Sequence, residues 1–339
     1  MKKVLFATTA LVFSAGIAAA EVSVGGDGRM GVVYNGDDWN FSSRIRVSFT
    51  ASGTTDGGLE FGGSVRADQA IAATRGTSAS VYISGAFGKL SMGDVVGAPE
   101  ALFGDFYEVG YTDLSSAGGS NDIGYLTADN GGNVDCTTTL APGISGCANS
   151  GPNLLYTGTF GAFSVAASVS DGKVNGATIG GLGVPVALGN GTVGVTDTSV
   201  TQQYGIAGAY TFGNYTVGMG YEYSNGRNQI SGPDVDVDMI SLAGVAQFGN
   251  TSVKGVIAHR GQDADINWYG LGASSVFGAT TVGGYVQYME DDNANTDTTW
   301  YGIGAEYDLG GGASIKGGIA DSDVSGSDAV ADLGVKFSF

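Results

Sequence analysis

Apolar and polar side chains alternate with a period of two along most of the chain. In residues 21–34 one face carries Val22, Val24, Gly26, Gly28, Met30, Val32 and Tyr34. Asp27 and Arg29 occupy the other face, and the end of the chain repeats the pattern with Ala329, Ala331, Leu333, Val335, Phe337 and Phe339. Successive side chains of a β-strand point to opposite faces, so this period predicts strands with one apolar and one polar face.

A short phrase of the form Phe-Gly-x separates many of the alternating segments. It occurs as Phe87-Gly88-Lys89, Phe160-Gly161-Ala162, Phe212-Gly213-Asn214, Phe248-Gly249-Asn250 and Phe277-Gly278-Ala279. After Phe212 it recurs at intervals of 36 and 29 residues, and a related Leu309-Gly310-Gly311 follows after 32. Two strands of ~10 residues and one long loop need about that much chain. We therefore expect short turns at one rim of the sheet and long loops at the other.

The pattern predicts sixteen strands. The expected spans are 21–34, 39–52, 58–70, 78–86, 88–95, 153–160, 162–171, 202–212, 214–225, 237–248, 250–261, 265–277, 279–290, 298–308, 313–322 and 329–339. After Ala20 no run of 18 apolar residues occurs, which argues against a membrane helix. Because only a closed barrel otherwise satisfies every backbone group within lipid, we expect an all-β, 16-stranded antiparallel transmembrane β-barrel with short periplasmic turns. Sixteen strands leave an aqueous lumen.

The first 20 residues have the pattern of a secretory signal peptide. Lys2 and Lys3 precede a mostly apolar stretch from Val4 to Ile17, and Ala18-Ala19-Ala20 is typical of a cleavage site. A single membrane anchor is the alternative interpretation, but the apolar run is short for one. We expect residues 1–20 to be removed and residues 21–339 to form a single barrel domain.

The mature chain is strongly acidic. Without Lys2 and Lys3 it carries 12 basic and 33 acidic residues, so it should repel nucleic acid and anionic surfaces. Much of the acid lies in expected loops, at Asp234, Asp236, Asp238, Asp291, Asp292, Asp297, Asp321, Asp323 and Asp328. These residues are interpreted either as solubilising or as ligands of structural Ca²⁺. No cofactor is expected to be required.

Two long gaps interrupt the strands, and the first is the candidate site. Residues 94–152 combine Phe103, Phe106, Tyr107 and Tyr111 with the acids Asp94, Glu100, Asp105, Glu108, Asp113 and Asp122. A loop that met only solvent would not need those aromatics, so we expect this third loop to fold into the barrel and narrow it. Residues 172–201 form the second gap.

Four arginines fall on the polar face of the first three strands: Arg29, Arg44, Arg46 and Arg66. Because these strands are neighbours, the guanidinium groups should form one basic patch on the lumen wall. They could also be ordinary wall charges paired with Asp27, Glu60 and Asp68. Acids of the inward loop opposite the patch would create a transverse field that favours polar solutes and sets ion preference.

The two cysteines, Cys136 and Cys147, lie in one Gly/Asn/Thr-rich stretch. An even number of cysteines in a loop of an exported protein predicts a disulfide, which would contribute ~2–3 kcal/mol by the chain-entropy model. A zinc site is disfavoured because the single histidine, His259, is remote in sequence.

Three stretches resemble general-diffusion porins of Gram-negative outer membranes, especially those of purple photosynthetic bacteria. They run from Arg29 to Arg44, from Leu102 to Asp113, and from Asp332 to Phe339. The resemblance implies a homotrimer in the bacterial outer membrane, in contact with membrane lipid and lipopolysaccharide. It also implies that the third loop narrows the pore and that the terminal Phe339 is read by the assembly machinery. The segment around the cysteines and residues 176–194 depart from the family pattern.

The expected function is a water-filled channel for passive diffusion of small hydrophilic solutes and ions. A solute-specific channel, for example for sugars, is the main alternative, but it would want aromatic side chains along the lumen, whereas Tyr221 and Tyr223 share the face of Val217 and Met219. A plugged structural barrel is a third hypothesis. An enzyme is not expected, because no Gly-x-Ser-x-Gly elbow occurs and His259 has no second histidine.

Overall fold

The computed structural model describes residues 21–68, 78–114, 122–127, 135–141, 144–148, 154–170, 186–188, 192–194, 201–226 and 235–339. The expected signal peptide, residues 1–20, lies outside the described residues. No helix in this described part of the chain is long and apolar enough to cross a membrane.

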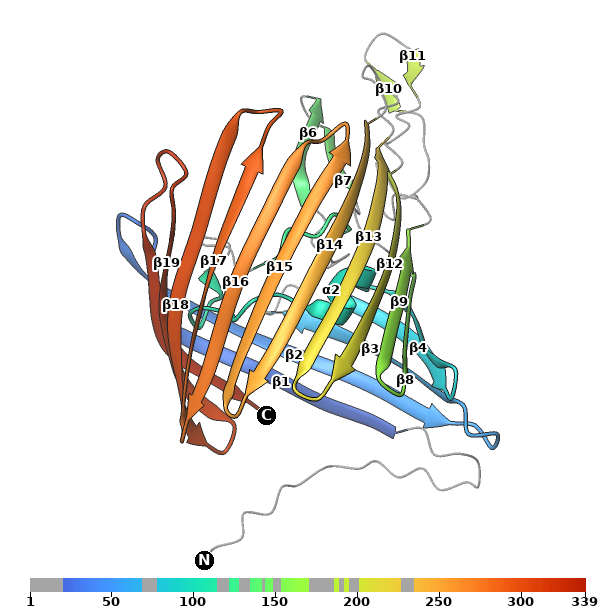
Figure 1. Ribbon diagram of the computed structural model, residues 1–339, viewed down its shortest axis with the longest axis horizontal. Coiled ribbons are helices and arrows are strands. Elements are labelled where there is room, and N and C mark those ends of the chain that lie inside the picture. Colours follow the sequence, from blue (N-terminus) through green and yellow to red (C-terminus); the bar gives the residue numbers. More distant parts are fainter. Residues whose placement is uncertain are drawn as a thin grey trace, which may run out of the picture.

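The described strands form a closed antiparallel barrel in which each strand pairs with the next and β1 pairs with β20 (Figure 1). Its sixteen strands are β1 Glu21–Tyr34, β2 Trp39–Thr54, β3 Glu60–Asp68, β4 Ser78–Gly85, β5 Gly88–Gly93, β8 Leu154–Phe160, β9 Phe163–Val169, β12 Thr201–Phe212, β13 Tyr215–Gly226, β14 Val235–Phe248, β15 Thr251–Gln262, β16 Ile266–Phe277, β17 Thr280–Asp291, β18 Thr296–Gly310, β19 Ala313–Ser322 and β20 Val330–Ser338. The sixteen-strand prediction is confirmed, and every predicted end lies within two residues of the observed one.

Three short elements inside the predicted loops were not expected from the sequence. A single-turn helix, α2 (Ala98–Phe103), follows β5. Two small hairpins, β6 (Asp135–Ala141) with β7 (Ile144–Ala148) and β10 (Val186–Leu188) with β11 (Thr192–Gly194), lie outside the barrel sheet. Their strands are too short for alternation to stand out against a Gly-rich background.

The recurring Phe-Gly-x phrase forms the short turns at the rim where β1 begins and β20 ends (Figure 1). Gly161, Gly213, Gly249 and Gly278 each have φ between +57° and +65°. Glycine adopts this conformation without strain and is favoured at the first position of a tight hairpin turn. At Phe87-Gly88 the phrase is displaced by one residue, because Gly88 already belongs to β5.

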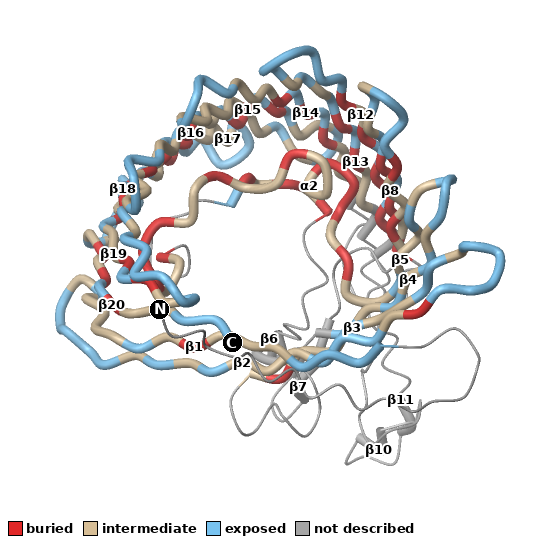
Figure 2. Tube along the Cα trace, turned by 90° about the horizontal axis from the view of Figure 1, so that it is seen from below, coloured by how far each residue is buried: buried red, intermediate tan, exposed pale blue. Residues whose placement is uncertain are grey.

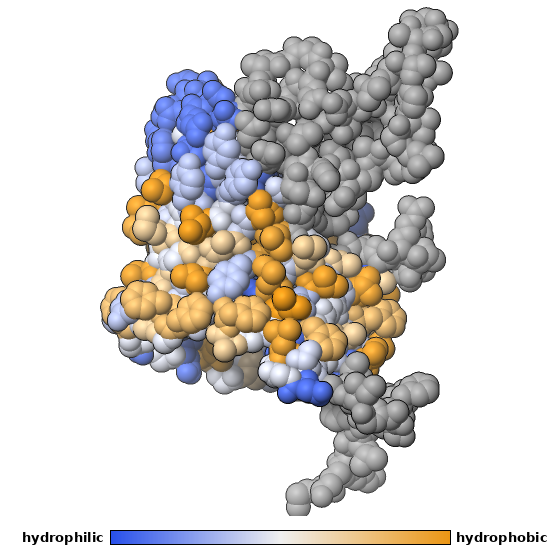
Figure 3. Space-filling view, turned by 90° about the vertical axis from the view of Figure 1, so that its right-hand side faces the viewer, coloured by the Kyte–Doolittle hydropathy of each residue, from blue (hydrophilic) through white to orange (hydrophobic). Residues whose placement is uncertain are grey.

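Large apolar side chains dominate the outward face of the barrel. Large side chains such as Val22, Ile206, Leu242 and Ile303 are more than half exposed. Figure 3 shows the resulting hydrophobic band, with hydrophilic residues above it. Aromatic rings cluster along the short-turn rim, where Phe163 contacts Tyr210 at 4.7 Å and Phe212 contacts Tyr215 at 5.6 Å between centroids. Such a band with an aromatic girdle is typical of a barrel in a bilayer.

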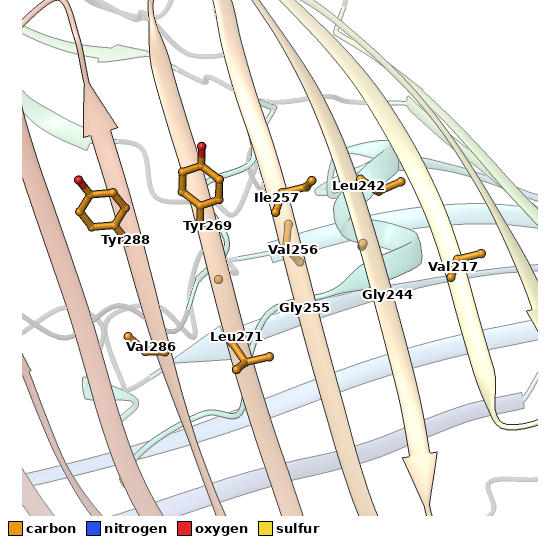
Figure 4. A pocket seen from close by; sticks show the side chains of 12 residues that line it. Val217, Leu242, Gly244, Gly255, Val256, Ile257, Tyr269, Leu271, Val286 and Tyr288 are labelled. Atoms are coloured by element: carbon orange, nitrogen blue, oxygen red, sulfur yellow. The ribbon is translucent and has the colours of Figure 1, made fainter.

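A shallow apolar groove of ≈ 550 Å³ crosses the outer face over β13–β17 (Figure 4). Its floor contains Gly244 and Gly255, which face each other across the β14–β15 pair, and its walls include Leu242, Ile257 and Leu271. Because the lining is apolar, the groove belongs to the hydrophobic band rather than to the polar interior.

Candidate pore constriction

The segment after β5 folds inward and follows the inner wall of the barrel (Figure 2). Its helix α2 lies against β9, β12 and β13, and the chain then runs past β15–β20 toward β1. Tyr111 and Leu114 are at most 1% exposed, and Phe103 and Phe106 are also buried. The prediction that this loop folds into the barrel is therefore confirmed for residues 94–114 and 122–127.

Inward-facing glycines of the wall make room for the apolar side chains of the loop. A Cβ atom added at Gly218 would lie 2.5 Å from the Phe103 ring, and one at Gly283 would lie 2.4 Å from the Tyr107 ring. Gly272 gives way to Phe106 and Gly334 to Tyr111 in the same manner. The high glycine content thus serves the packing of the loop as well as the curvature of the strands.

Charged wall side chains fasten the loop backbone. Lys254 on β15 donates to the carbonyl of Asp105 at 2.6 Å, and Arg260 donates to the carbonyl of Gly124 at 2.7 Å. On β13 the fully buried carboxylate of Glu222 accepts bonds from the backbone N–H groups of Leu126 and Thr127, both at 3.0 Å, and from the Thr127 hydroxyl. Hydrogen bonds to charged groups contribute about 1.5–3 kcal/mol each, so the loop is held firmly.

Four of the predicted loop acids act on one another electrostatically: Asp105, Glu108, Asp113 and Asp122. Asp94 and Glu100 precede this group, at the end of β5 and in α2. Burial, reinforced by the charges of Glu108 and Asp122, raises the pKa of Asp113 to about 6. Burial also raises the pKa values of Asp105 and Asp122. This part of the loop therefore concentrates negative charge inside the barrel.

Glu108 is the acid of this group that lies against basic wall residues. Its carboxylate forms ion pairs with Lys316 on β19 at 3.0 Å and with Lys336 on β20 at 3.4 Å. Burial alone would raise the pKa of Glu108, but the two lysines outweigh it and lower the pKa below its ordinary value. Glu108 therefore stays ionised in the lumen.

The four predicted arginines lie on neighbouring strands, as expected from the alternation of inward and outward residues along β1–β3. Arg29 is the register partner of Arg44, and Arg46 and Arg66 both bind Asp68, at 2.8 and 2.9 Å. Arg44 is paired with Asp27 at 3.2 Å. The arginines therefore share one wall, and three of them pair with Asp27 or Asp68, whereas the Arg29 guanidinium donates to the backbone carbonyl of Tyr111. Glu60, the third proposed partner, instead accepts a bond from Ser84.

Several lumen residues were not recognised as functional from the sequence. The loop is held by four wall residues: Lys254, Arg260, Glu222 and Asp332. In the sequence they differ from other polar strand residues only in that they fall on the inward face. Inward aromatics were missed as well: Trp268 stacks on Trp300 at 5.5 Å and lies under Gly124 of the loop. Tyr221 is exposed on the outer face, as predicted.

The expected disulfide and metal sites remain predictions. The side chains of Cys136 and Cys147 lie outside the described residues. Among the described residues no group of three or more His, Cys, Asp or Glu side chains is arranged to hold a metal ion. His259 is exposed on the outer face and contacts Asn267 at 3.0 Å.

We predict that Cys136 and Cys147 are oxidised to a disulfide. The backbones of β6 and β7 pair antiparallel, with Asp135 opposite Ala148 and Thr138 opposite Gly146, which brings the two cysteine positions to neighbouring strands. Mass mapping of unreduced peptides should recover the two cysteines as one linked species. Alkylation of both thiols without reductant would contradict this prediction.

Comparison with known proteins agrees with this architecture. A family model described as Gram-negative porin matches residues 7–327. The porin of Rhodobacter capsulatus is 50% identical over 342 residues, which cover 94% of this chain and 100% of that protein. A solved porin structure refined at 1.8 Å matches with a TM-score of 0.75 and 49% identity, with the same coverage of both chains.

A more distant match shows the fold alone. A triple mutant of Rhodopseudomonas blastica porin has a TM-score of 0.61 at 22% identity, and it covers 94% of this chain and 100% of its own. Porins are channels of the outer membrane rather than enzymes, and the closed barrel with its apolar outer band fits that location. With the family model and the Rhodobacter capsulatus relative both spanning nearly the whole chain, the chain belongs to the Gram-negative porin family.

Proposed function

We propose that the inward loop and the arginine wall form the constriction of a general-diffusion channel for small hydrophilic solutes and ions. The observation that carries the proposal is the placement of charge: acids on residues 105–122 of the loop, and arginines on β1–β3. Opposed charges across a constriction produce a transverse field that orders water. A polar solute replaces that water at low cost, whereas an apolar solute does not.

Ion transport follows from the same charges. Asp27 and Asp68 offset part of the positive charge of Arg44, Arg46 and Arg66, and the mature chain as a whole carries 33 acidic against 12 basic residues. We therefore propose a preference for cations. Single-channel conductance in a planar bilayer, with the reversal potential measured under a salt gradient, tests it directly. A reversal potential that indicates anion preference would contradict the assignment.

We predict that sugars enter liposomes containing this protein at rates that fall smoothly with molecular size. The reason is that the polar lumen wall is expected to pass hydrophilic solutes according to size, and neither the family nor the relatives above are described as sugar-specific. Osmotic swelling of vesicles with a graded series of sugars measures the rates. Saturable uptake of a single sugar at low concentration would instead support the solute-specific channel.

We also propose a homotrimer assembled through the outer face of β1–β5. Three of these strands are short, with nine, eight and six residues in β3, β4 and β5. Over them lies an apolar groove of ≈ 750 Å³ lined by residues that include Val22, Phe49, Phe61, Val81 and Met92. A short wall bearing an apolar hollow is better covered by protein than by lipid. Phe61→Arg should shift the protein from trimer to monomer in detergent, as measured by native mass spectrometry, whereas Phe277→Arg on the far face should not.

The remaining features of the proposal come from the sequence. Residues 1–20 are removed as a signal peptide on export, and Phe339 serves as the assembly signal. The acidic residues of the loops either keep the protein soluble or bind structural Ca²⁺, and the apolar band contacts lipid and lipopolysaccharide. Isothermal titration of the folded barrel with Ca²⁺ tests the calcium assignment, and absence of heat at millimolar Ca²⁺ would contradict it.

A further inference from the structure

One peptide of the constriction loop is gripped on both sides by the barrel wall. The carboxylate of Asp332 on β20 accepts bonds from the N–H groups of Tyr111 at 3.1 Å and Thr112 at 2.8 Å, and from the Thr112 hydroxyl at 2.6 Å. On the other side of the same residue, the Arg29 guanidinium donates to the carbonyl of Tyr111 at 3.1 Å. Asp332 is only 4% exposed, so its carboxylate interacts with this loop peptide rather than with solvent.

The surrounding residues fit this contact closely. Gly110 has φ +81°, and a Cβ atom added there would lie 2.4 Å from the Asp332 carboxylate. The Tyr111 ring packs on Gly334, where an added Cβ would lie 2.8 Å away. The Tyr111 hydroxyl reaches across to the backbone carbonyl of Ser42 on β2 at 3.3 Å. Three strands, β20, β1 and β2, therefore converge on this one residue.

The contact lies next to the charges of the constriction. Glu108, with its two lysine partners, precedes Tyr111 by three residues, and Asp113 follows Tyr111 by two. Arg29 is both a member of the arginine wall and a ligand of the Tyr111 carbonyl, and it is close enough to Glu108 for their charges to interact. A displacement of Tyr111 would thus move loop acids and release one wall arginine at the same time.

We infer that Asp332 is a positioning residue of the channel. By holding the Tyr111–Thr112 peptide, it fixes at the constriction both the acidic limb of the loop, which carries Glu108 and Asp113, and the Arg29 side chain. The inference rests on the proposed function, because it assumes that these charges line the path of ions. Polar parity places Asp332 on the inner face of the last strand, but only the structure gives it this role. Glu222 holds a different stretch of the loop, at residues 126–127.

The test compares two variants that break the contact in different ways. Asp332→Ala removes the acceptor together with its charge. Gly110→Ala keeps every charge but drives a methyl group into the carboxylate. If Asp332 acts by position, both variants should broaden the open-channel conductance distribution and raise current noise about twofold or more, since the limb moves between several positions. Asp321→Asn removes an acid that bonds Tyr301 on the outer face, and it should leave the conductance distribution unchanged.

The outcomes are distinct. A steady, parent-like conductance in Gly110→Ala, or a shift of reversal potential without added noise in Asp332→Ala, would overturn the inference and leave Asp332 as a fixed charge only. Heat-modifiable gel mobility identifies correctly folded barrels in each preparation, and only those are compared. If Gly110→Ala does not fold, Thr112→Val supplies a second charge-neutral variant, because it removes the 2.6 Å bond to Asp332.

Coupling between Asp332 and Arg29 separates this inference from the proposed function. Arg29→Ser should raise noise, and combining it with Asp332→Ala should add little, because both side chains hold the same peptide. Additive noise would overturn the inference. If the noise behaves as expected but replacing the wall arginines leaves the ion selectivity unchanged, the proposed role of these charges at the constriction fails and the positioning role of Asp332 stands.

Discussion

Replacing Arg44 and Arg46 with serine is expected to make the channel markedly more cation-selective. The change removes two positive charges from the lumen wall, together with the ion pairs that Arg44 forms with Asp27 and Arg46 forms with Asp68. Serine keeps the wall polar, and the outward Ile45 and Val47 remain in place, so the barrel should fold normally. The remaining field of the lumen then attracts cations more strongly.

The size of the effect follows from the charges. At ~4–6 Å and partly screened, one lost charge changes the energy of a passing ion by on the order of 1 kcal/mol, which is enough to alter permeability ratios several-fold. High salt should reduce the effect as the Debye length falls. The reversal potential under a salt gradient measures it, and Lys89→Ser is a matched control that removes a positive charge near the short-turn rim.

An unchanged reversal potential at low salt would show that ions pass beyond the reach of these two arginines. The observed register places Arg46 opposite Asp27 and Asp68 on its two neighbouring strands, so these three residues lie on the same face of the wall. The outcome therefore tests whether the arginine wall lines the ion path, independently of the barrel fold.

The barrel could be predicted from the sequence because its strands and tight turns are determined by residues that are close together in the chain. Period-two alternation places Ile45 and Val47 on one face and Arg44 and Arg46 on the other without any knowledge of distant contacts. A tight turn likewise leaves its mark in glycines such as Gly213 and Gly249. These signals fixed strand positions to within two residues of those observed.

The fastening of the loop could not be predicted in the same way, because it depends on pairs far apart in sequence. Asp332 binds residues some 220 positions earlier, and Glu222 binds residues about 95 positions earlier. Nothing local distinguishes these acids from other lumen-facing charges. Nor does the sequence show that Gly218 or Gly283 faces an aromatic side chain of the loop. An inward glycine gives the same sequence pattern whether it allows a strand to bend or makes room for an aromatic ring.

The sequence did contain one usable sign of the loop's course. A stretch that combines buried-type aromatics with acids, such as residues 103–113, must bury the former while presenting the latter to water, and the edge of a lumen offers both. What it could not give is the state of each acid. Glu108 is kept charged by two lysines, whereas Asp113, five residues later, has its pKa raised by burial and by its acidic neighbours.

That difference predicts a pH-dependent selectivity. With the pKa of Asp113 raised to about 6, the group is mostly ionised at pH 7 and mostly neutral at pH 5. Lowering the pH across this range should therefore remove one negative charge from the constriction and reduce cation preference, whereas Glu108, with its lowered pKa, keeps its charge. The reversal potential under a salt gradient, measured at half-unit steps of pH, should show a transition near pH 6.

Asp113→Asn identifies the group responsible. This variant should have the reduced cation preference of the pH 5 parent at every pH and should lose the transition, because the amide is neutral throughout. His259 lies on the outer face beside Asn267, so His259→Gln should keep the transition. Persistence of the transition in Asp113→Asn would assign it to another loop carboxyl, with Asp105 and Asp122 next, since burial raises the pKa of both. In that case the lumen would still sense protons, but through the limb that Gln287 and Lys254 hold rather than the one held by Asp332.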